Sequence, residues 1–175
     1  PSTGILRVTY DLLSFSVSDR KRPGPSRRSN EISKMIEWAL SPVLNLKDFP
    51  NTVIDVQIYI PQADASTRVA GINAASMALA HAGIPMKDLV TSVSMGKLDK
   101  ELVVDVDKEE EDFKDGEGAT DFPLAKIAHG NEFTLIQLDG KMQPELISKA
   151  LTMASKACEV IYEVQKKALK EVVGA

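Results

Sequence analysis

The segment Gln62-Ala63-Asp64-Ala65-Ser66-Thr67-Arg68 runs from an alternating apolar stretch directly into an alanine-rich helical pattern. A helix start offers unpaired backbone N–H groups and a partial positive charge, which together attract anions. Thr67 adds a hydroxyl and Arg68 a guanidinium at this point, so Ser66, Thr67 and Arg68 are candidate ligands of inorganic phosphate. The alternative is that Ser66 or Thr67 only caps the helix and that Arg68 is solvated.

Regular patterns on both sides place this segment between a strand and a helix. Residues 52–60 alternate between apolar and polar side chains, which predicts a strand with one buried face. The helix that follows covers about residues 67–82, and its many alanines permit close packing on a sheet. Gly83 and Pro85 are typical of a helix end, so the helix stops there.

The rest of the chain predicts further strands and two more helices. One helix starts at a cap on Ser29 or Asn30 and ends at Pro42, and a long amphipathic helix covers residues 144–172. Strands are expected within residues 3–17 and at residues 89–96, 101–105, 122–128 and 133–138. Strands interrupted by single helices predict an α+β fold, with a mixed sheet and helices packed on one side.

Length and composition predict one globular domain covering residues 1–175. The chain has 175 residues and 43% hydrophobic side chains, enough for a substantial core. Its single cysteine, Cys158, cannot form an internal disulfide, so we expect a cytoplasmic location. No apolar run approaches the roughly 18 residues that span a bilayer, so no membrane partner is expected. The chain starts at Pro1, close to the first predicted strand, and we expect it to lack N-terminal strands.

Charge is distributed unevenly, although the net charge of −4 gives no general reason to expect a nucleic-acid partner. Residues 20–28 carry five cations and no anion. Arginine binds phosphodiester oxygens through its planar fork, so Arg22, Arg27 and Arg28 are candidate ligands of an RNA backbone. The alternative is a solvated basic loop.

An acidic segment covers residues 105–121, with nine carboxylates against two lysines. It contains the run Glu109-Glu110-Glu111-Asp112 and then Asp121, and two carboxylates brought together this way can bind a divalent metal or divide into an ion and a proton donor. The glycines Gly116 and Gly118 between them allow many loop geometries, so the spacing leaves their separation open. The alternative is a solvated acidic loop.

Four ordered strings in the chain resemble the RNase PH family, and within it the phosphorolytic RNase PH-like subunit of the archaeal exosome. They are Arg20–Lys34 (RKRPGPSRRSNEISK), Phe49–Val56 (FPNTVIDV), Gln62–Ser76 (QADASTRVAGINAAS) and Ala82–Leu89 (AGIPMKDL). The resemblance spans nearly the whole chain, and strings of this length are more specific than a single short motif.

This resemblance implies a ribosomal protein S5 domain 2-like fold, which is the RNase PH fold. It also implies a hexameric ring in which the chain alternates with a catalytically silent RNase PH-like paralogue, capped by RNA-binding subunits. RNA in the central channel would lose nucleotides from its 3′ end to inorganic phosphate, as nucleoside diphosphates. The alternatives are a non-catalytic RNA-binding ring subunit, and a homohexameric RNase PH that trims tRNA 3′ ends.

The resemblance also implies roles for single residues. Arg27 and Arg28 match the pair that grips RNA phosphates, and Thr67 and Arg68 match the pair that binds inorganic phosphate. Ser66 stands where the family usually has glycine, so a side chain must be accommodated beside the phosphate.

Two carboxylates complete the implied site. Asp121 matches the family's second active-site aspartate, and Asp112 best matches the first, so these two would be catalytic and would hold Mg²⁺ or Mn²⁺. The loop between them is longer than the usual family version, which leaves Glu111 as a rival for the first position.

Overall fold

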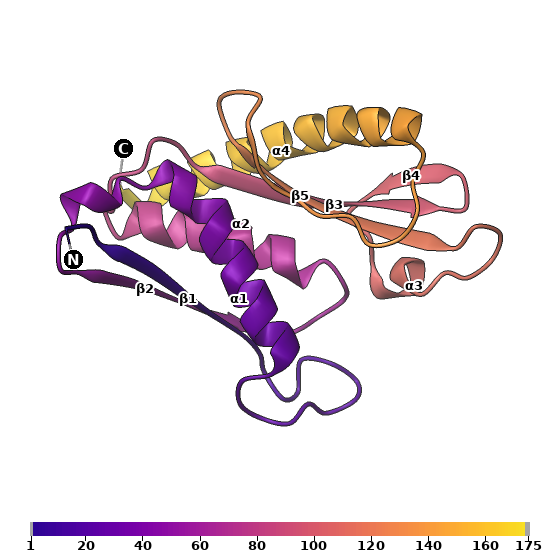
Figure 1. The fold of residues 1–175 in the computed structure, drawn as a ribbon, viewed down its shortest axis with the longest axis horizontal. Coiled ribbons are helices and arrows are strands. Elements are labelled where there is room, and N and C mark those ends of the chain that lie inside the picture. The colour runs from indigo at the N-terminus through magenta and orange to yellow at the C-terminus, as the bar shows by residue number, and fades with distance from the viewer. Residues whose placement is uncertain (1, 174–175) are drawn as a thin grey trace.

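The computed structural model describes residues 2–173, and their helices and strands stack in four layers (Figure 1). A two-stranded sheet is covered by α1 and α2, which in turn contact a four-stranded sheet, and α4 covers the far face of that sheet. Two short 3-10 helices, η1 (Ser41–Val43) and η2 (Leu46–Asp48), lie between α1 and the strand that follows.

The first layer consists of β1 (Ile5–Leu12) and β2 (Val53–Ile60), which pair in parallel. Alternate side chains of both strands are buried, because one face lies on the helices and the other is exposed. The buried set is Leu6, Val8, Tyr10, Ile54, Val56, Ile58 and Ile60. On the exposed face Arg7 and Asp55 lie opposite each other and form a salt bridge. The predicted strand at residues 52–60 is therefore confirmed as β2.

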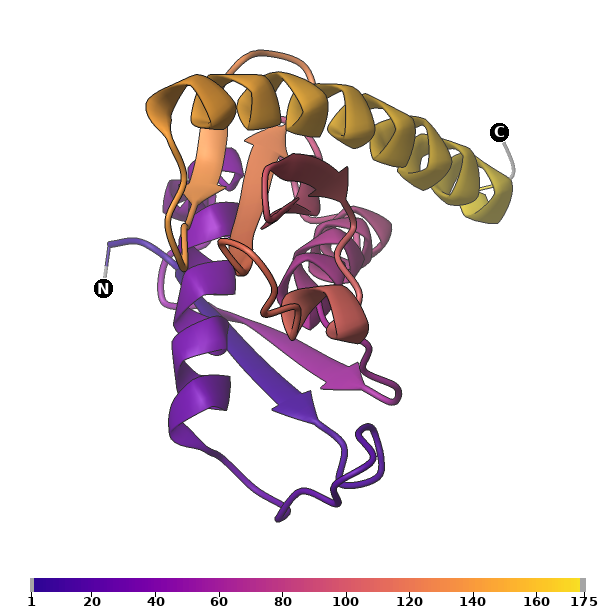
Figure 2. The ribbon, with the colours of Figure 1, turned by 90° about the vertical axis from the view of Figure 1, so that its right-hand side faces the viewer.

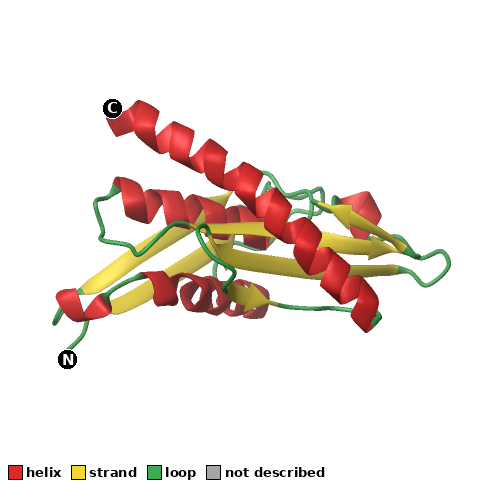
Figure 3. Ribbon diagram, turned by 90° about the horizontal axis from the view of Figure 1, so that it is seen from above, coloured by secondary structure: helices red, strands yellow, loops and turns green. Residues whose placement is uncertain are grey.

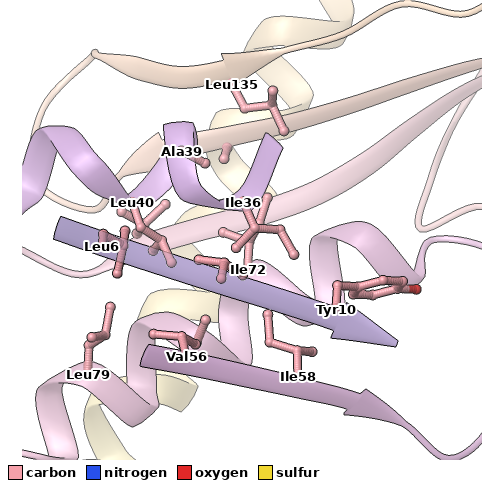
Figure 4. Packing of buried hydrophobic residues seen from close by; sticks show 14 of the residues in the cluster. Leu6, Tyr10, Ile36, Ala39, Leu40, Val56, Ile58, Ile72, Leu79 and Leu135 are labelled. Atoms are coloured by element: carbon pink, nitrogen blue, oxygen red, sulfur yellow. The ribbon is translucent and has the colours of Figure 1, made fainter. Parts of the chain in front are cut away.

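The second layer consists of α1 (Arg27–Leu40) and α2 (Thr67–His81). Figure 4 shows their apolar side chains meeting those of β1 and β2. Gly71 of α2 makes this contact close, since a Cβ there would lie 3.2 Å from Ile36 Cδ1 and 3.5 Å from Ile58 Cγ2. The tight packing fixes α2 between α1 and β2, and with it the segment at its N-terminus.

The third layer is an antiparallel sheet in the order β4-β3-β5-β6. Its strands are β3 (Val90–Leu98), β4 (Glu101–Val104), β5 (Ala119–Ile127) and β6 (Phe133–Ile136). A one-turn helix, α3 (Lys108–Glu111), lies in the connection from β4 to β5. Nearly all of β3 is buried, because helices cover both faces of this sheet.

The fourth layer is α4 (Pro144–Val173), which crosses the sheet obliquely (Figure 3). Its contact forms a second apolar cluster, consisting of Val93, Met95, Phe122, Leu124, Ala150, Ala154 and Cys158. Small side chains on α4 bring the helix close to the large side chains of the strands. Within residues 2–173, no helix is both long enough and apolar enough to pass through a membrane.

Three details of the predicted architecture are wrong. The strands form two separate sheets, one parallel and one antiparallel, instead of one mixed sheet. Helices lie on both faces of the four-stranded sheet instead of one side, because β3 and β5 contribute buried apolar side chains to a cluster on each face. The first helix starts at Arg27, since the cap is Ser26 rather than Ser29 or Asn30.

We expect Ile36→Ala to lower the free energy of unfolding by about 2–5 kcal/mol, because it leaves a cavity where α1 meets α2 and β1. Ile36 is fully buried, whereas Ile5, on the outer face of β1, is 51% exposed. Ile5→Ala is the matched control and should cost under about 0.5 kcal/mol. Urea unfolding followed by circular dichroism measures both, and equal losses would contradict the layer assignment.

Candidate active site

The turn before α2 has an unusual backbone. Ala65 and Ser66 have φ values of +51° and +47°, in the left-handed region that side-chain-bearing residues rarely adopt. Ser66 occupies the N-cap position of α2 but makes no side-chain capping bond to it. The simple capping role considered for Ser66 is therefore wrong. The N–H groups at the start of α2 remain able to donate hydrogen bonds to an anion.

The Ser66 side chain instead joins the turn to the segment before α3. Its hydroxyl donates to the Val106 carbonyl at 2.7 Å, and the Lys108 N–H donates to Asp64 Oδ1 at 3.1 Å. A serine hydroxyl has one proton, so a Ser66 hydroxyl that donates to Val106 has none left for a phosphate oxygen. The structure leaves Ser66 its backbone N–H as the anion-binding group.

A narrow cavity lies at the start of α2 and collects side chains from five elements. It is lined by Arg28, Ile32, Ser66, Thr67, Arg68, Val69, Ser94, Glu111, Asp121 and Pro123. The cavity therefore brings together the predicted phosphate ligands, one of the predicted RNA ligands and one of the two predicted aspartates. Figure 2 faces this side of the molecule, with the basic loop and the start of α1 below α3.

Two guanidinium groups give the cavity its positive charge. Arg68 donates to the side-chain amide oxygen of Gln137, which follows β6 and holds the guanidinium in place. Arg28 enters from the first turn of α1. Within the described part of the chain, neither arginine forms an ion pair with a carboxylate. Both charges are thus available to an external anion such as phosphate.

Asp121 provides a carboxyl group on the opposite wall of the cavity. It lies on β5, and Ser94 of β3 donates to its Oδ1 at 2.8 Å. Burial raises the pKa of Asp121 above its ordinary value, although the Ser94 hydrogen bond and the charge of Arg68 act in the opposite direction. A carboxyl group with a raised pKa is suited to donate a proton in a reaction near neutral pH.

The two candidates for the first carboxylate have different surroundings. Glu111, in α3, lines the narrow cavity and also a neighbouring one that includes Asp121 and Asp139. Asp112 lies outside both, with its side chain 62% exposed and 2.8 Å from Lys108 Nζ. Lys108 Nζ also lies 3.1 Å from the Glu111 carboxylate, so the two candidates differ in that only Glu111 lines the cavity. The structure brings Glu111, and not Asp112, to the cavity.

The acidic groups fit a divalent cation only in part. Within residues 2–173, no cluster of three or more His, Cys, Asp or Glu side chains is close enough to hold a metal ion. Mg²⁺ is commonly bound by one or two carboxylates together with substrate phosphate. Glu111, Asp121 and Asp139 line one cavity and supply hard oxygen donors. The donor set therefore fits Mg²⁺ or Mn²⁺ shared with a bound phosphate, and not an all-protein site.

The remaining predicted RNA ligands lie beside the narrow cavity. Ser26 and Ser29 form a capping box at the start of α1, which puts Arg27 and Arg28 in the first helical turn. Cations at a helix N-terminus oppose the helix dipole, so a bound anion would relieve their repulsion. Arg22, Arg27 and Arg28 all line a second cavity, and Arg28 connects it to the first.

Sequence reasoning missed Ser94 and Gln137. Neither residue belongs to a recognisable motif, and each reaches the site through pairing of distant segments. The expected strands at residues 89–96 and 122–128 offered one signal. Ser94 lies directly opposite Pro123 in the β3–β5 ladder, beside Asp121, but the register is fixed only by the fold.

Family comparisons cover nearly all of the chain. Residues 1–85 match the 3′ exoribonuclease family, domain 1, and residues 88–157 match domain 2 of the same family. The first region contains the predicted phosphate and RNA ligands, and the second contains the carboxylates.

Similar proteins include exosome complex component Rrp41 from three archaea. The identity is 50% to the protein from Thermococcus gammatolerans, 52% to that from Thermococcus kodakarensis and 51% to that from Pyrococcus furiosus. Each alignment covers 98% of this chain and 67% of the relative.

Among solved structures, rice (Oryza sativa) Rrp46 matches with a TM-score of 0.83 at 22% identity, over 97% of this chain and 75% of that one. This likeness shows the fold, and the relatives and family matches show the ancestry. The predicted fold class and the resemblance are both confirmed: the chain belongs to the 3′ exoribonuclease family, also called the RNase PH family.

Proposed function

We propose that this chain is the phosphorolytic 3′-to-5′ exoribonuclease subunit of an archaeal exosome. It would use inorganic phosphate to release nucleoside diphosphates from RNA 3′ ends. The observation that carries the proposal is the narrow cavity in which Thr67, Arg68 and Arg28 face Asp121. About half of the aligned residues are identical to those of archaeal proteins named exosome complex component Rrp41, which supports the same assignment.

In this mechanism the start of α2 holds the attacking phosphate. Backbone N–H groups of the left-handed turn, the Thr67 hydroxyl and the Arg68 guanidinium bind its oxygens. Arg22, Arg27 and Arg28 hold the RNA backbone so that the terminal linkage lies beside the phosphate. Most of the rate in phosphoryl transfer comes from such positioning and from electrostatic stabilisation.

The reaction needs no reactant other than RNA and inorganic phosphate, because one bond to phosphorus forms while another breaks. An oxygen of inorganic phosphate bonds to the phosphorus of the terminal linkage, and the bond from that phosphorus to the 3′ oxygen of the shortened RNA breaks. Asp121 gives its proton to this leaving oxygen. A Mg²⁺ or Mn²⁺ ion held by Glu111 and Asp139 would neutralise charge on the phosphoryl oxygens. The released nucleotide carries two phosphates and is a nucleoside diphosphate.

The proposed assembly follows from the same family. The chain would alternate with a non-catalytic RNase PH-like paralogue in a hexameric ring in the cytoplasm, and RNA-binding subunits would cap the ring. Two alternatives make different predictions. A silent ring subunit would bind RNA without turnover, and a homohexameric RNase PH would be active without a paralogue.

The decisive experiment incubates end-labelled RNA with the protein and magnesium, with or without phosphate and with or without the paralogue. Nucleoside diphosphates that appear only with phosphate would support the proposal. Nucleoside monophosphates would indicate hydrolysis and contradict it. Binding without turnover would favour the silent subunit, and full activity without the paralogue would favour the homohexamer.

Removing the Arg68 guanidinium should abolish most turnover. Arg68→Ala takes away the phosphate ligand that Gln137 orients, and we expect the phosphorolysis rate to fall by about 100-fold or more. Arg7→Ala is the control, because Arg7 lies on the outer face of β1 and pairs with Asp55. Steady-state assays of diphosphate release measure both, and an Arg68→Ala enzyme with near-normal rate would refute the assigned phosphate site.

Removing the charge of each candidate carboxylate in turn distinguishes which of the two is the first active-site carboxylate. Both carboxylates pair with Lys108, but only Glu111 lines the cavity, so Glu111→Gln should reduce turnover by about tenfold or more while Asp112→Asn has a smaller effect. The rate is measured at saturating phosphate and RNA over a range of magnesium concentrations. If Asp112→Asn reduces turnover more than Glu111→Gln does, Asp112 is the first active-site carboxylate.

A further inference from the structure

We propose that Tyr10 is a positioning residue for the phosphate nucleophile, whose phenol orients the Thr67 hydroxyl so that the threonine donates its proton to phosphate. The inference rests on the proposed function and goes beyond it, because it gives a role to a core residue that contacts neither phosphate nor RNA in the mechanism above. Tyr10 acts only through Thr67.

The phenol of Tyr10 is fixed by its surroundings. Figure 4 shows the ring at the end of β1 with its oxygen directed away from the apolar side chains. The residue is 2% exposed, and its Oη donates to Thr67 Oγ1 at 2.7 Å. Its backbone N–H donates to Ser33 Oγ at 2.9 Å, and Gly71 leaves room for the ring. The tyrosine therefore has little freedom to turn away from Thr67.

The direction of this hydrogen bond determines what Thr67 can do. Burial raises the pKa of the Tyr10 phenol above its ordinary value, although the bond to Thr67 and the charges of Arg28 and Arg68 lower it. The phenol thus keeps its proton at neutral pH, and in the structure it donates that proton to Thr67 Oγ1. The Thr67 oxygen accepts this proton, and the threonine's own proton remains free for another acceptor.

The narrow cavity offers the free proton of Thr67 a place for an anionic acceptor. Within residues 2–173, Thr67 Oγ1 donates to no protein acceptor, and the residue lines the narrow cavity together with Arg28 and Arg68. A hydroxyl that accepts one hydrogen bond becomes a stronger donor in another. An anion in this cavity would meet a hydroxyl already turned toward it, without the entropy cost of ordering a free rotor.

Tyr10→Phe tests this role, because it removes the phenol oxygen and keeps the ring in the core. We expect the KM for phosphate to rise by about three- to tenfold, with the KM for RNA unchanged. Tyr59→Phe is the matched control, since Tyr59 is 58% exposed and its hydroxyl bonds to Gln57 on the outer sheet face. A purely structural role would lower the melting temperature and leave the KM for phosphate unchanged, which would overturn the inference.

A double-mutant cycle with Thr67→Val separates direct from indirect action. If Tyr10 acts through Thr67, adding Tyr10→Phe to Thr67→Val should cause no further rise in the KM for phosphate. If the two substitutions raise the KM for phosphate independently, so that their fold-changes multiply, the inference is overturned.

Phosphate binding measured by calorimetry distinguishes this inference from the proposed function. If wild-type protein binds phosphate but turns over no RNA, the proposed function fails, and weaker binding to Tyr10→Phe would still support the Tyr10 role. Equal binding by wild type and Tyr10→Phe would overturn the role of Tyr10 alone. Wild-type protein that binds no phosphate would overturn both.

Discussion

The close packing of α2 between the two sheets is the constraint on which the rest of the molecule depends. Gly71 lets α1 and β2 approach the helix, and further along Asn73 and Ser76 bond to the backbone of β3. One helix therefore sets the distance between the parallel and the antiparallel sheet. Its N-terminus is fixed by the same contacts, so the turn before α2 is held by the core on one side and by the bonds to Val106 and Lys108 on the other.

The turn itself carries a conformational cost that nearby bonds offset. Left-handed backbone at a residue with a side chain costs about 1–2 kcal/mol, and here Ala65 and Ser66 both adopt it. The Ser66 bond to Val106 and the bond from Lys108 to Asp64 stabilise the same turn. A serine in place of the family's usual glycine is thus accommodated by a contact that glycine lacks.

Local sequence patterns predicted the helices and strands well, whereas they could not predict the contacts between distant segments. The period-two pattern of residues 52–60 and the alanine-rich pattern of residues 67–82 correspond closely to β2 and α2, because the first reports burial of one strand face and the second combines good helix formers with a glycine and proline at the end. The cap of α1 was misplaced, because Ser26 and Ser29 are both good capping residues. Arg68 meeting Gln137, and Tyr10 meeting Thr67, depend on how the layers stack, which no local pattern encodes.

The two family-matched regions contribute opposite chemistry to one cavity. Every arginine of the site belongs to residues 1–85, and every carboxylate belongs to residues 88–157. Neither region alone supplies both signs of charge to this cavity. The cavity lies between the two regions. A substitution that shifts one region against the other therefore changes the distances between the opposite charges of the cavity, even when it replaces no charged residue.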